Sequence, residues 1–385
     1  MDAQAEEILR FFRDIPDPRA TNARHRLSDI LAIAIMGVFC GADGWAAVEQ
    51  WALCNKIWLA TLLDLPHGIP THDTFDRVFG LLNPDAFEQC FMCWTKELAK
   101  NANAKFLAID GKTIRRSFAK GWKKTPAHLI SAFVSANHLV LAQVKTDENS
   151  NEITAIPKLL ALLDLRGTTV TIDAIGCQKE IAQRIIRQKG HYVLALKSNQ
   201  ELLHAKTKSL LDEAIRESFH GMQHDFFTSV DGDHGRIETR RAWCTSEVHW
   251  LKDLAAQWPG LGSLAVVESV REQKDSLEAA SVTRRYYISS HDGTDAKLLA
   301  EAIRGHWGIE NSLHWCLDVA MGEDQCRLRV KHGAENFARL RRIAINKLKR
   351  HKVIKPNGKE LKVGIKIKQQ GCGWSHEQLL LAMLA

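Results

Sequence analysis

Apolar residues recur every three or four positions through the first hundred residues of the chain. The segments LSDILAIAIMGVFCGA (27–42) and WAAVEQWALC (45–54) show this spacing, which is typical of amphipathic helices. Prolines separate these stretches, and capping residues open a further short helix at 71–82. The pattern predicts an all-helical N-terminal domain over residues 1–103.

The pattern changes to short apolar runs at Lys105. Several segments are rich in strand-forming residues: FLAID (106–110), the hairpin-like LISAFVSANHLVLAQVK (129–145), TTVTID (168–173) and HYVLALK (191–197). Helical periodicity separates them at 153–165 and 180–190. The order strand, hairpin, helix, strand, helix, strand predicts a mixed sheet with helices packed against it.

Strand-like runs also dominate residues 201–290, after an opening helix and with glycine-rich turn signals at DGDHG and WPGLG. Helical periodicity then returns over 291–352, and a basic tail occupies 353–385. We therefore expect an α/β core whose first part spans 104–200. A β-rich insertion would follow it, and the helices of 291–352 would complete the core.

The composition is that of a folded cytoplasmic protein. Of 385 residues, 45% are apolar and 25% charged, and the length predicts two or three domains. No apolar window is long enough for a membrane helix, and the acidic N-terminus is not typical of a signal peptide. Nine cysteines, an odd number, favour a reducing compartment. Cys90 and Cys93 form a CxxC without a second pair at zinc spacing, so we interpret them as core residues.

The positive charge of the chain is concentrated near its C-terminus. Residues 327–368 hold fifteen Lys and Arg against two Glu, which leaves 37 basic and 43 acidic residues elsewhere. Within 333–352 the pattern predicts an amphipathic helix with Phe337 and Leu340 on its apolar stripe and Arg339 and Arg342 on the other side. Any surface helix shows such a pattern, but the excess of charge favours a basic surface that binds nucleic acid phosphates.

Two acidic residues close predicted strands. Asp110 ends FLAID and is followed by GKTIRRS, whereas Asp173 ends TTVTID and is followed by AIGCQ. Acids at the carboxyl ends of neighbouring strands share one edge of an open sheet, where ligands bind. A lone aspartate at a strand end is more often a turn or helix cap. Two of them, one followed by basic residues, favour a site for hard divalent cations and phosphate.

A third acid is expected in RGHWGIENSLHWCLDVAMGED (304–324). At helical spacing His306, Glu310, His314 and Asp318 fall on one face, which predicts either a metal-binding face or a polar helix surface. The His-Glu-x-x-His order of a zinc protease is absent.

Together these segments resemble the DDE transposases of bacterial insertion sequences, in the branch that includes the H-repeat-associated proteins. The resemblance lies in AIDGKTIRRS, NEITAIPKLLALLDL, TIDAIGCQ, YVLALKSNQ, GRIETR, RYYIS, HWGIENSLHWCLDV, GEDQCRLR and ENFARLRRIAINKLK, and it covers nearly the whole chain in order. The better-known relatives carry Tyr, Arg and Lys around the catalytic Glu. Those places hold Ile303, His306 and Leu317 here.

The resemblance implies a ribonuclease-H-like catalytic domain with Asp110, Asp173 and Glu310 as the catalytic, metal-binding acids. It places Glu310 ahead of Asp318, Glu323 and Asp324 as the third acid. Two Mg²⁺ ions, with Mn²⁺ as a substitute, would be the cofactors. Double-stranded DNA would be the partner, bound by a homodimer in the nucleoid, and the N-terminal domain would serve DNA-end recognition or assembly.

The expected DNA-binding residues are Lys112, Arg115, Arg116, Lys197, Arg304, His306, Arg327, Arg329, Arg339 and Arg342. Asn311 is expected to orient Glu310. Three alternatives stay open at this stage. They are a structure-specific nuclease of the same fold, a catalytically silent DNA-binding relic of a mobile element, and a zinc hydrolase using His306 and His314.

Overall fold

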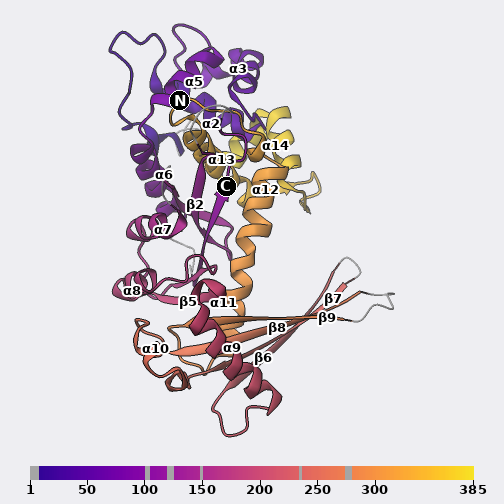
Figure 1. The fold of residues 1–385 in the computed structure, drawn as a ribbon. Coiled ribbons are helices and arrows are strands. Elements are labelled where there is room, and N and C mark those ends of the chain that lie inside the picture. Colours follow the sequence, from indigo (N-terminus) through magenta and orange to yellow (C-terminus); the bar gives the residue numbers. More distant parts are fainter. Residues whose placement is uncertain (1–7, 100–104, 119–124, 148–150, 234–235, 274–279) are drawn as a thin grey trace.

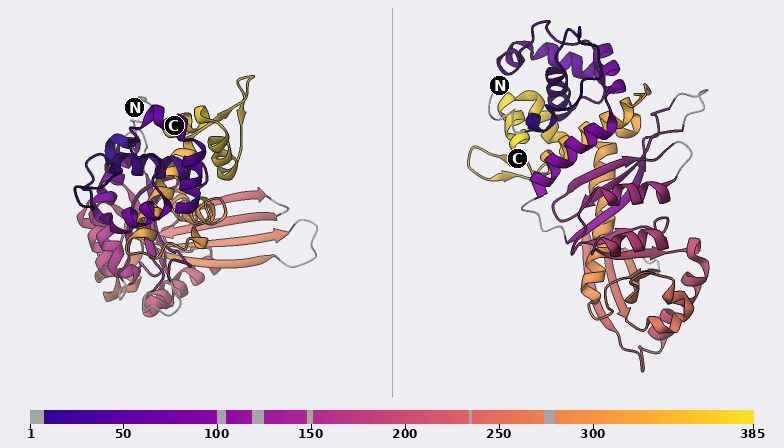
Figure 2. Two further views of the ribbon diagram at one scale, coloured as in Figure 1. Left: turned by 90° about the horizontal axis from the view of Figure 1, so that it is seen from above. Right: turned by 90° about the vertical axis from the view of Figure 1, so that its left-hand side faces the viewer.

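The computed structural model describes residues 8–99, 105–118, 125–147, 151–233, 236–273 and 280–385. The molecule is elongated, with a helical body at one end and a sheet that runs to the other end (Figure 1, Figure 2). The predicted boundary at 103/104 lies outside the described residues. No helix of the described part is both long enough and apolar enough to cross a membrane.

Nine strands form one mixed sheet in the order β3-β2-β1-β4-β5-β9-β8-β7-β6. β1 (Phe106–Thr113) is parallel to β4 (Thr169–Ile172), and β4 is parallel to β5 (His191–Leu196). β2 (His128–Val134) is antiparallel to both β1 and β3 (Leu139–Lys145). The prediction of a mixed sheet is confirmed.

The strands of the insertion extend this same sheet. β9 (Ser281–Ser289) pairs antiparallel with β5, and β8 (Ser263–Gln273), β7 (Arg236–Thr245) and β6 (Asp225–Asp233) follow in turn. Their far ends project away from the rest of the molecule (Figure 1, Figure 2). The β-rich segment therefore continues the core sheet and does not close into a sheet of its own.

Helices cover both faces of the sheet. α7 (Glu152–Ala161) and α8 (Lys179–Arg187) pack into one apolar core that includes Tyr192 and Leu194 of β5. α11 (Ala296–Gly308) packs into a second cluster that includes Val193, the residue between them. Successive residues of a strand point to opposite faces, so α11 lies on the face opposite to α7 and α8.

α11 continues into a longer helix that reaches from the sheet to the helical body (Figure 1). A π-helical segment, η4 (Ile309–His314), follows it, then α12 (Trp315–Val319) and the short turn η5 (Glu323–Gln325). The other helices and strands between residues 198 and 361 are η2 (Ser198–Gln200), α9 (Glu201–Arg216), η3 (Val248–Leu251), α10 (Asp253–Ala256), β10 (Val353–Ile354) and β11 (Glu360–Leu361).

Both ends of the chain build the helical body. From residue 8 to 99 the elements are η1 (Arg10–Phe12), α2 (Leu27–Phe39), α3 (Trp45–Cys54), α4 (Lys56–Leu62), α5 (His72–Leu81) and α6 (Pro84–Ala99). They share one apolar core with α13 (Gly333–Arg350), α14 (Ile365–Trp374) and α15 (His376–Leu384). The N-terminal helices therefore fold around the C-terminal ones, with α13 enclosed between them.

This enclosure overturns the predicted exposed basic face of α13. Arg339 is 1% exposed, and its Nε lies 2.6 Å from an oxygen of Glu88 in α6. Arg342 is fully buried against Glu323, which is also fully buried. Buried charges require partners, and both arginines have them inside the protein. Neither side chain can reach DNA in this structure, so their assignment as DNA-binding residues is wrong.

Arg342→Leu should strongly destabilise the protein, because it leaves the carboxylate of Glu323 buried without its partner. We expect the free energy of unfolding to fall by about 3–5 kcal/mol in urea denaturation. The double variant Arg342→Leu/Glu323→Leu should recover most of this loss, and Lys352→Ala, at an exposed position, should change little. Equal losses in the single and double variants would contradict a role for the ion pair.

Candidate active site

Asp110 and Asp173 lie beside each other, although β1 continues to Thr113 and does not end at Asp110 as predicted. β1 and β4 are parallel, with Ile109 opposite Ile172, so the next residue of each chain segment is an aspartate. Asp173 also accepts backbone hydrogen bonds from Ile175 (3.1 Å) and Gly176 (3.4 Å), which is the turn-capping role that such a residue often has. These two bonds both use its Oδ1 atom.

Glu310 reaches the same region from the long helix that begins with α11 and packs on one face of the sheet. It belongs to η4, the π-helical segment, and its side chain is exposed. His306, one turn earlier, makes a 3.2 Å hydrogen bond from Nδ1 to Thr171 Oγ1 in β4. His314, at the end of η4, places Nδ1 3.6 Å from Asp110 Oδ2. The π-helical segment is thus tied at both ends to the strands that carry the aspartates.

A pocket of about 130 Å³ lies between these elements. Its lining includes Thr171, Asp173, Lys197, Arg285, His306, Trp307 and Glu310. A larger groove of about 1270 Å³ shares part of this lining and continues along α11 and strands β6–β8. Arg304 and Asn311 line the groove, and the guanidinium of Arg285 lies 4.5 Å from the Trp307 ring centre.

Negative charge is concentrated around Asp110. Burial, together with the nearby charges of Asp173, Glu152 and Glu310, raises the pKa of Asp110 to about 7. Burial and the charge of Glu152 also raise the pKa of Asp173, although the backbone groups of its turn and the charge of Lys197 oppose this. The neighbouring carboxylates therefore make it harder for Asp110 and Asp173 to ionise.

The two histidines do not balance this charge. Burial lowers the pKa of His306 to about 4, and burial with nearby cations lowers the pKa of His314 to about 3. Both rings are therefore neutral at pH 7. The donor set of the site is oxygen-rich and negative, which fits a hard divalent cation. Within the described ranges, no three acidic, histidine or cysteine side chains converge closely enough to hold a metal ion.

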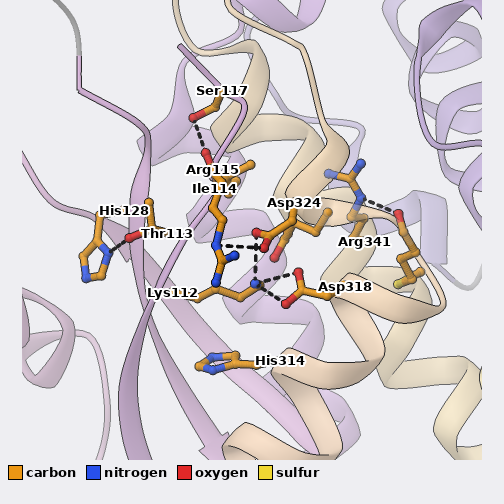
Figure 3. Close-up of polar contacts among 12 residues, drawn as sticks. Lys112, Thr113, Ile114, Arg115, Ser117, His128, His314, Asp318, Asp324 and Arg341 are labelled. Carbon is orange, nitrogen blue, oxygen red and sulfur yellow. Dashed lines mark hydrogen bonds and ion pairs between the residues drawn. The ribbon is translucent and has the colours of Figure 1, made fainter.

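The predicted phosphate clamp at Lys112 needs correction. Its side chain is 8% exposed, and Nζ lies 2.6 Å from Asp318 Oδ1 and 3.3 Å from Asp324 Oδ1 (Figure 3). Arg115, whose side chain is 80% exposed, places Nε 3.2 Å from Asp324 Oδ2. Lys112 therefore fastens β1 to the end of the long helix and offers no free cation to phosphate.

The same contacts involve the other candidates for the third acid. Asp318 and Asp324 are paired with Lys112, and Glu323 is buried against Arg342. Glu310 has no ion-pair partner within the described part of the chain, and it lines the pocket together with Asp173. Glu310 as the third acid stays a prediction.

The other predicted residues are distributed along the surface around the site. Lys197 is exposed at the pocket, and Arg304 lies 3.5 Å from Asp231 at the groove. His306 is turned inward to Thr171. Three more are exposed: Arg116, Arg327 and Arg329. Their contact with DNA, and the orienting role of Asn311, stay predictions.

Sequence reasoning missed Glu152, the first residue of α7, whose charge acts on both aspartates. The directions of the strands could have indicated that Glu152 lies near Asp110. β1 and β3 run in the same direction because each is antiparallel to β2. The helix that follows β3 therefore starts at the sheet edge where Asp110 lies, and its first residue is acidic.

Comparison with known proteins identifies the class to which this fold and site belong. A family model described as "Transposase DDE domain" matches residues 102–347, and one described as "DDE_Tnp_1-associated" matches residues 9–95. The chain belongs to the DDE transposase family, as its motifs predicted.

Two relatives from Escherichia coli cover almost the whole chain. "Putative transposase YncI" of strain O157:H7 is 41% identical over 366 residues, which are 95% of this chain and 91% of that protein. "H repeat-associated putative transposase YhhI" of strain K12 is 41% identical over 357 residues, 91% and 93% of the two chains. The piggyBac transposase synaptic complex with hairpin DNA aligns at 12% identity over 97% of this chain and 77% of that one. Its TM-score of 0.38 is too low to support an argument.

The raised pKa of Asp110 predicts a stability that depends on pH. Between about pH 4 and pH 7 the folded protein keeps a proton on Asp110 that the unfolded chain releases. Stability is therefore lost as the pH rises through this window, by up to about 4 kcal/mol. Asp110→Asn is neutral throughout, so without divalent cations it should be more stable than wild type at pH 8 and equal to it at pH 4.

Thermal unfolding of both proteins with a chelator present measures this difference. The control is Asp253→Asn at an exposed position, which should follow wild type at both pH values. A constant difference between Asp110→Asn and wild type from pH 4 to pH 8 would show that Asp110 does not titrate in this window.

Proposed function

We propose that this chain is a DDE transposase that cleaves DNA at the ends of an insertion sequence and joins them to target DNA. The observation that carries the proposal is the placement of Asp110 in β1 beside Asp173, which directly follows the parallel strand β4, with Asp173 and Glu310 lining one pocket. In a chain of this family, that arrangement supports phosphoryl transfer on DNA by a ribonuclease-H-like core.

Asp110, Asp173 and Glu310 are the residues that would hold two Mg²⁺ ions, with Mn²⁺ as a substitute. Bound there, such ions supply Lewis acidity that stabilises the attacking and leaving oxygens of the phosphate. The protein's own part is to fix the three carboxylates on rigid elements. His314 contacts Asp110 and His306 contacts Thr171, so the helix that carries Glu310 is held against both strands.

DNA would lie along the groove beside α11. Lys197 at the pocket and Arg304 in the groove offer exposed cations to phosphates. Arg116, Arg327 and Arg329 add positive charge near the end of β1, where the Nε of Arg329 donates to the Arg116 carbonyl over 3.4 Å. Bringing two DNA ends together would require a homodimer on DNA. We place this reaction at the nucleoid in the cytoplasm.

A labelled duplex that carries the ends flanking this gene tests the proposal. With Mg²⁺ or Mn²⁺, the wild type should nick the duplex to leave a 3′-hydroxyl and join that end to target DNA. Asp110→Asn, Asp173→Asn and Glu310→Gln should each lower the rate by at least about a thousandfold, because each removes a ligand from an active centre whose parts act together. Asp253→Asn should keep wild-type activity.

Other outcomes separate the alternatives. Cleavage without joining would indicate a structure-specific nuclease of the same fold. Binding without cleavage, equal in wild type and variants, would indicate a DNA-binding relic. Activity that survives Glu310→Gln would move the third acid to Asp318 or Asp324.

A further inference from the structure

Glu152 lies at the place where α7 meets β1. It is the first residue of α7, and the N-cap residue Asn151 accepts a 3.1 Å hydrogen bond from the backbone of Ile153. A carboxylate in the first turn also suits the positive end of the helix dipole. The helix start is therefore well defined, and it fixes the backbone of Glu152 beside the strand that carries Asp110.

The residue after Asp110 is Gly111, and the position of the Glu152 side chain leaves no room for a Cβ atom there. A Cβ atom on Gly111 would lie 2.4 Å from Glu152 Oε1 and 2.5 Å from His128 Nε2. Both distances are far below a normal contact, so no larger residue fits at this position without displacing them. Glu152 and His128 thus pack directly against the backbone next to Asp110.

His128 holds the carboxylate of Glu152 in place. Its Nε2 lies 2.8 Å from Glu152 Oε1, and its Nδ1 lies 2.7 Å from Thr113 Oγ1. Figure 3 shows the contact between His128 and Thr113. An ionised carboxylate only accepts hydrogen bonds, so Nε2 donates to Glu152, and in the neutral ring Nδ1 accepts from the hydroxyl of Thr113. The side chains of Glu152 and His128 are 17% and 24% exposed.

Within the described residues, this arrangement leaves the second carboxylate oxygen of Glu152 without a hydrogen-bond or ion-pair partner, close to two other acids. The charge of Glu152 acts on both Asp110 and Asp173. Lys112, the nearest basic residue along β1, is already paired with Asp318 and Asp324. A third negative group has thus been fixed beside the aspartates by a dedicated pair of hydrogen bonds.

We infer that Glu152 is a fourth carboxylate of the active site, which is oriented by His128 and Thr113 and strengthens the binding of a divalent cation at Asp110 and Asp173. The inference rests on the proposed function, because it assigns a residue to the same centre. Carboxylate oxygens are the ligands that Mg²⁺ and Mn²⁺ prefer, and each added negative charge raises the affinity of such a site.

Binding of Mn²⁺ to the full chain tests this inference without relying on activity. Free Mn²⁺ is followed by electron paramagnetic resonance, with the protein alone and with the unlabelled end duplex. Glu152→Gln keeps the size and hydrogen-bond geometry of the side chain but removes its charge, and it should weaken Mn²⁺ binding at least tenfold. His128→Gln, which loosens Glu152 but leaves it charged, should weaken binding by about threefold.

Glu180→Gln is the matched control, because Glu180 also lies in the first turn of a helix on this face of the sheet and is exposed. It should bind Mn²⁺ like wild type. Circular dichroism and the thermal midpoint of each variant establish that it is folded before binding is measured. Asp110→Asn and Asp173→Asn define the loss expected when an aspartate of the site is removed.

The outcomes separate this inference from the proposed function. If both aspartate variants lose Mn²⁺ while Glu152→Gln binds it like wild type, the inference is overturned and the proposed function stands. If wild type and all variants bind Mn²⁺ equally or not at all, the proposed metal centre fails, and the inference fails with it. Unchanged binding in His128→Gln would overturn the orienting role of that residue alone.

Discussion

The ion pair between Arg342 and Glu323 ties the helical body to β1, the strand that carries Asp110. Both side chains are fully buried. Burial alone would raise the pKa of Glu323, but the charges of Arg342 and Arg341 hold this pKa below its ordinary value. The next residue, Asp324, contacts Lys112 and Arg115 of β1 and its extension. A continuous series of ion pairs thus runs from the core of α13 to a point two residues from Asp110. A buried charge must keep its partner, so the position of the turn η5, and through it of β1, is set by α13.

The long helix beside the sheet is held by a second set of contacts at its π-helical segment. Such segments have wider turns than an α-helix and are frequent at functional sites. Here the segment carries Glu310, while His306 contacts β4, His314 contacts β1 and Asp318 contacts Lys112. Three of the four residues that helical spacing places on one face therefore fasten the helix to the sheet. Glu310 is the member of that face that stays available at the pocket.

Local pattern predicted the parts of this architecture that depend on nearby residues. The β-branched and aliphatic runs FLAID and TTVTID form strands because such residues fit a sheet buried on both faces, although β1 continues past Asp110 to Thr113. The burial of Arg339 and Arg342 could not be predicted from the local sequence pattern. The amphipathic pattern of α13 is local, whereas the partners Glu88 and Glu323 come from other segments, one of them about 250 residues away. Glu152 was missed for a related reason, since an acid at a helix start has a sufficient local explanation.

The charged groups around Asp110 influence whether its carboxyl group is ionised. The charges of Asp173, Glu152 and Glu310 all act on Asp110, and His306 and His314 are neutral at pH 7 because they are buried. Lys112 is committed to the acids that hold the helix, and the basic residues lining the pocket are Lys197 and Arg285. Even beside these cations, the pKa of Asp110 is raised to about 7. Positive charge from outside the chain would favour ionisation of Asp110 at neutral pH, so the binding of a cation beside Asp110 would be coupled to the release of its proton.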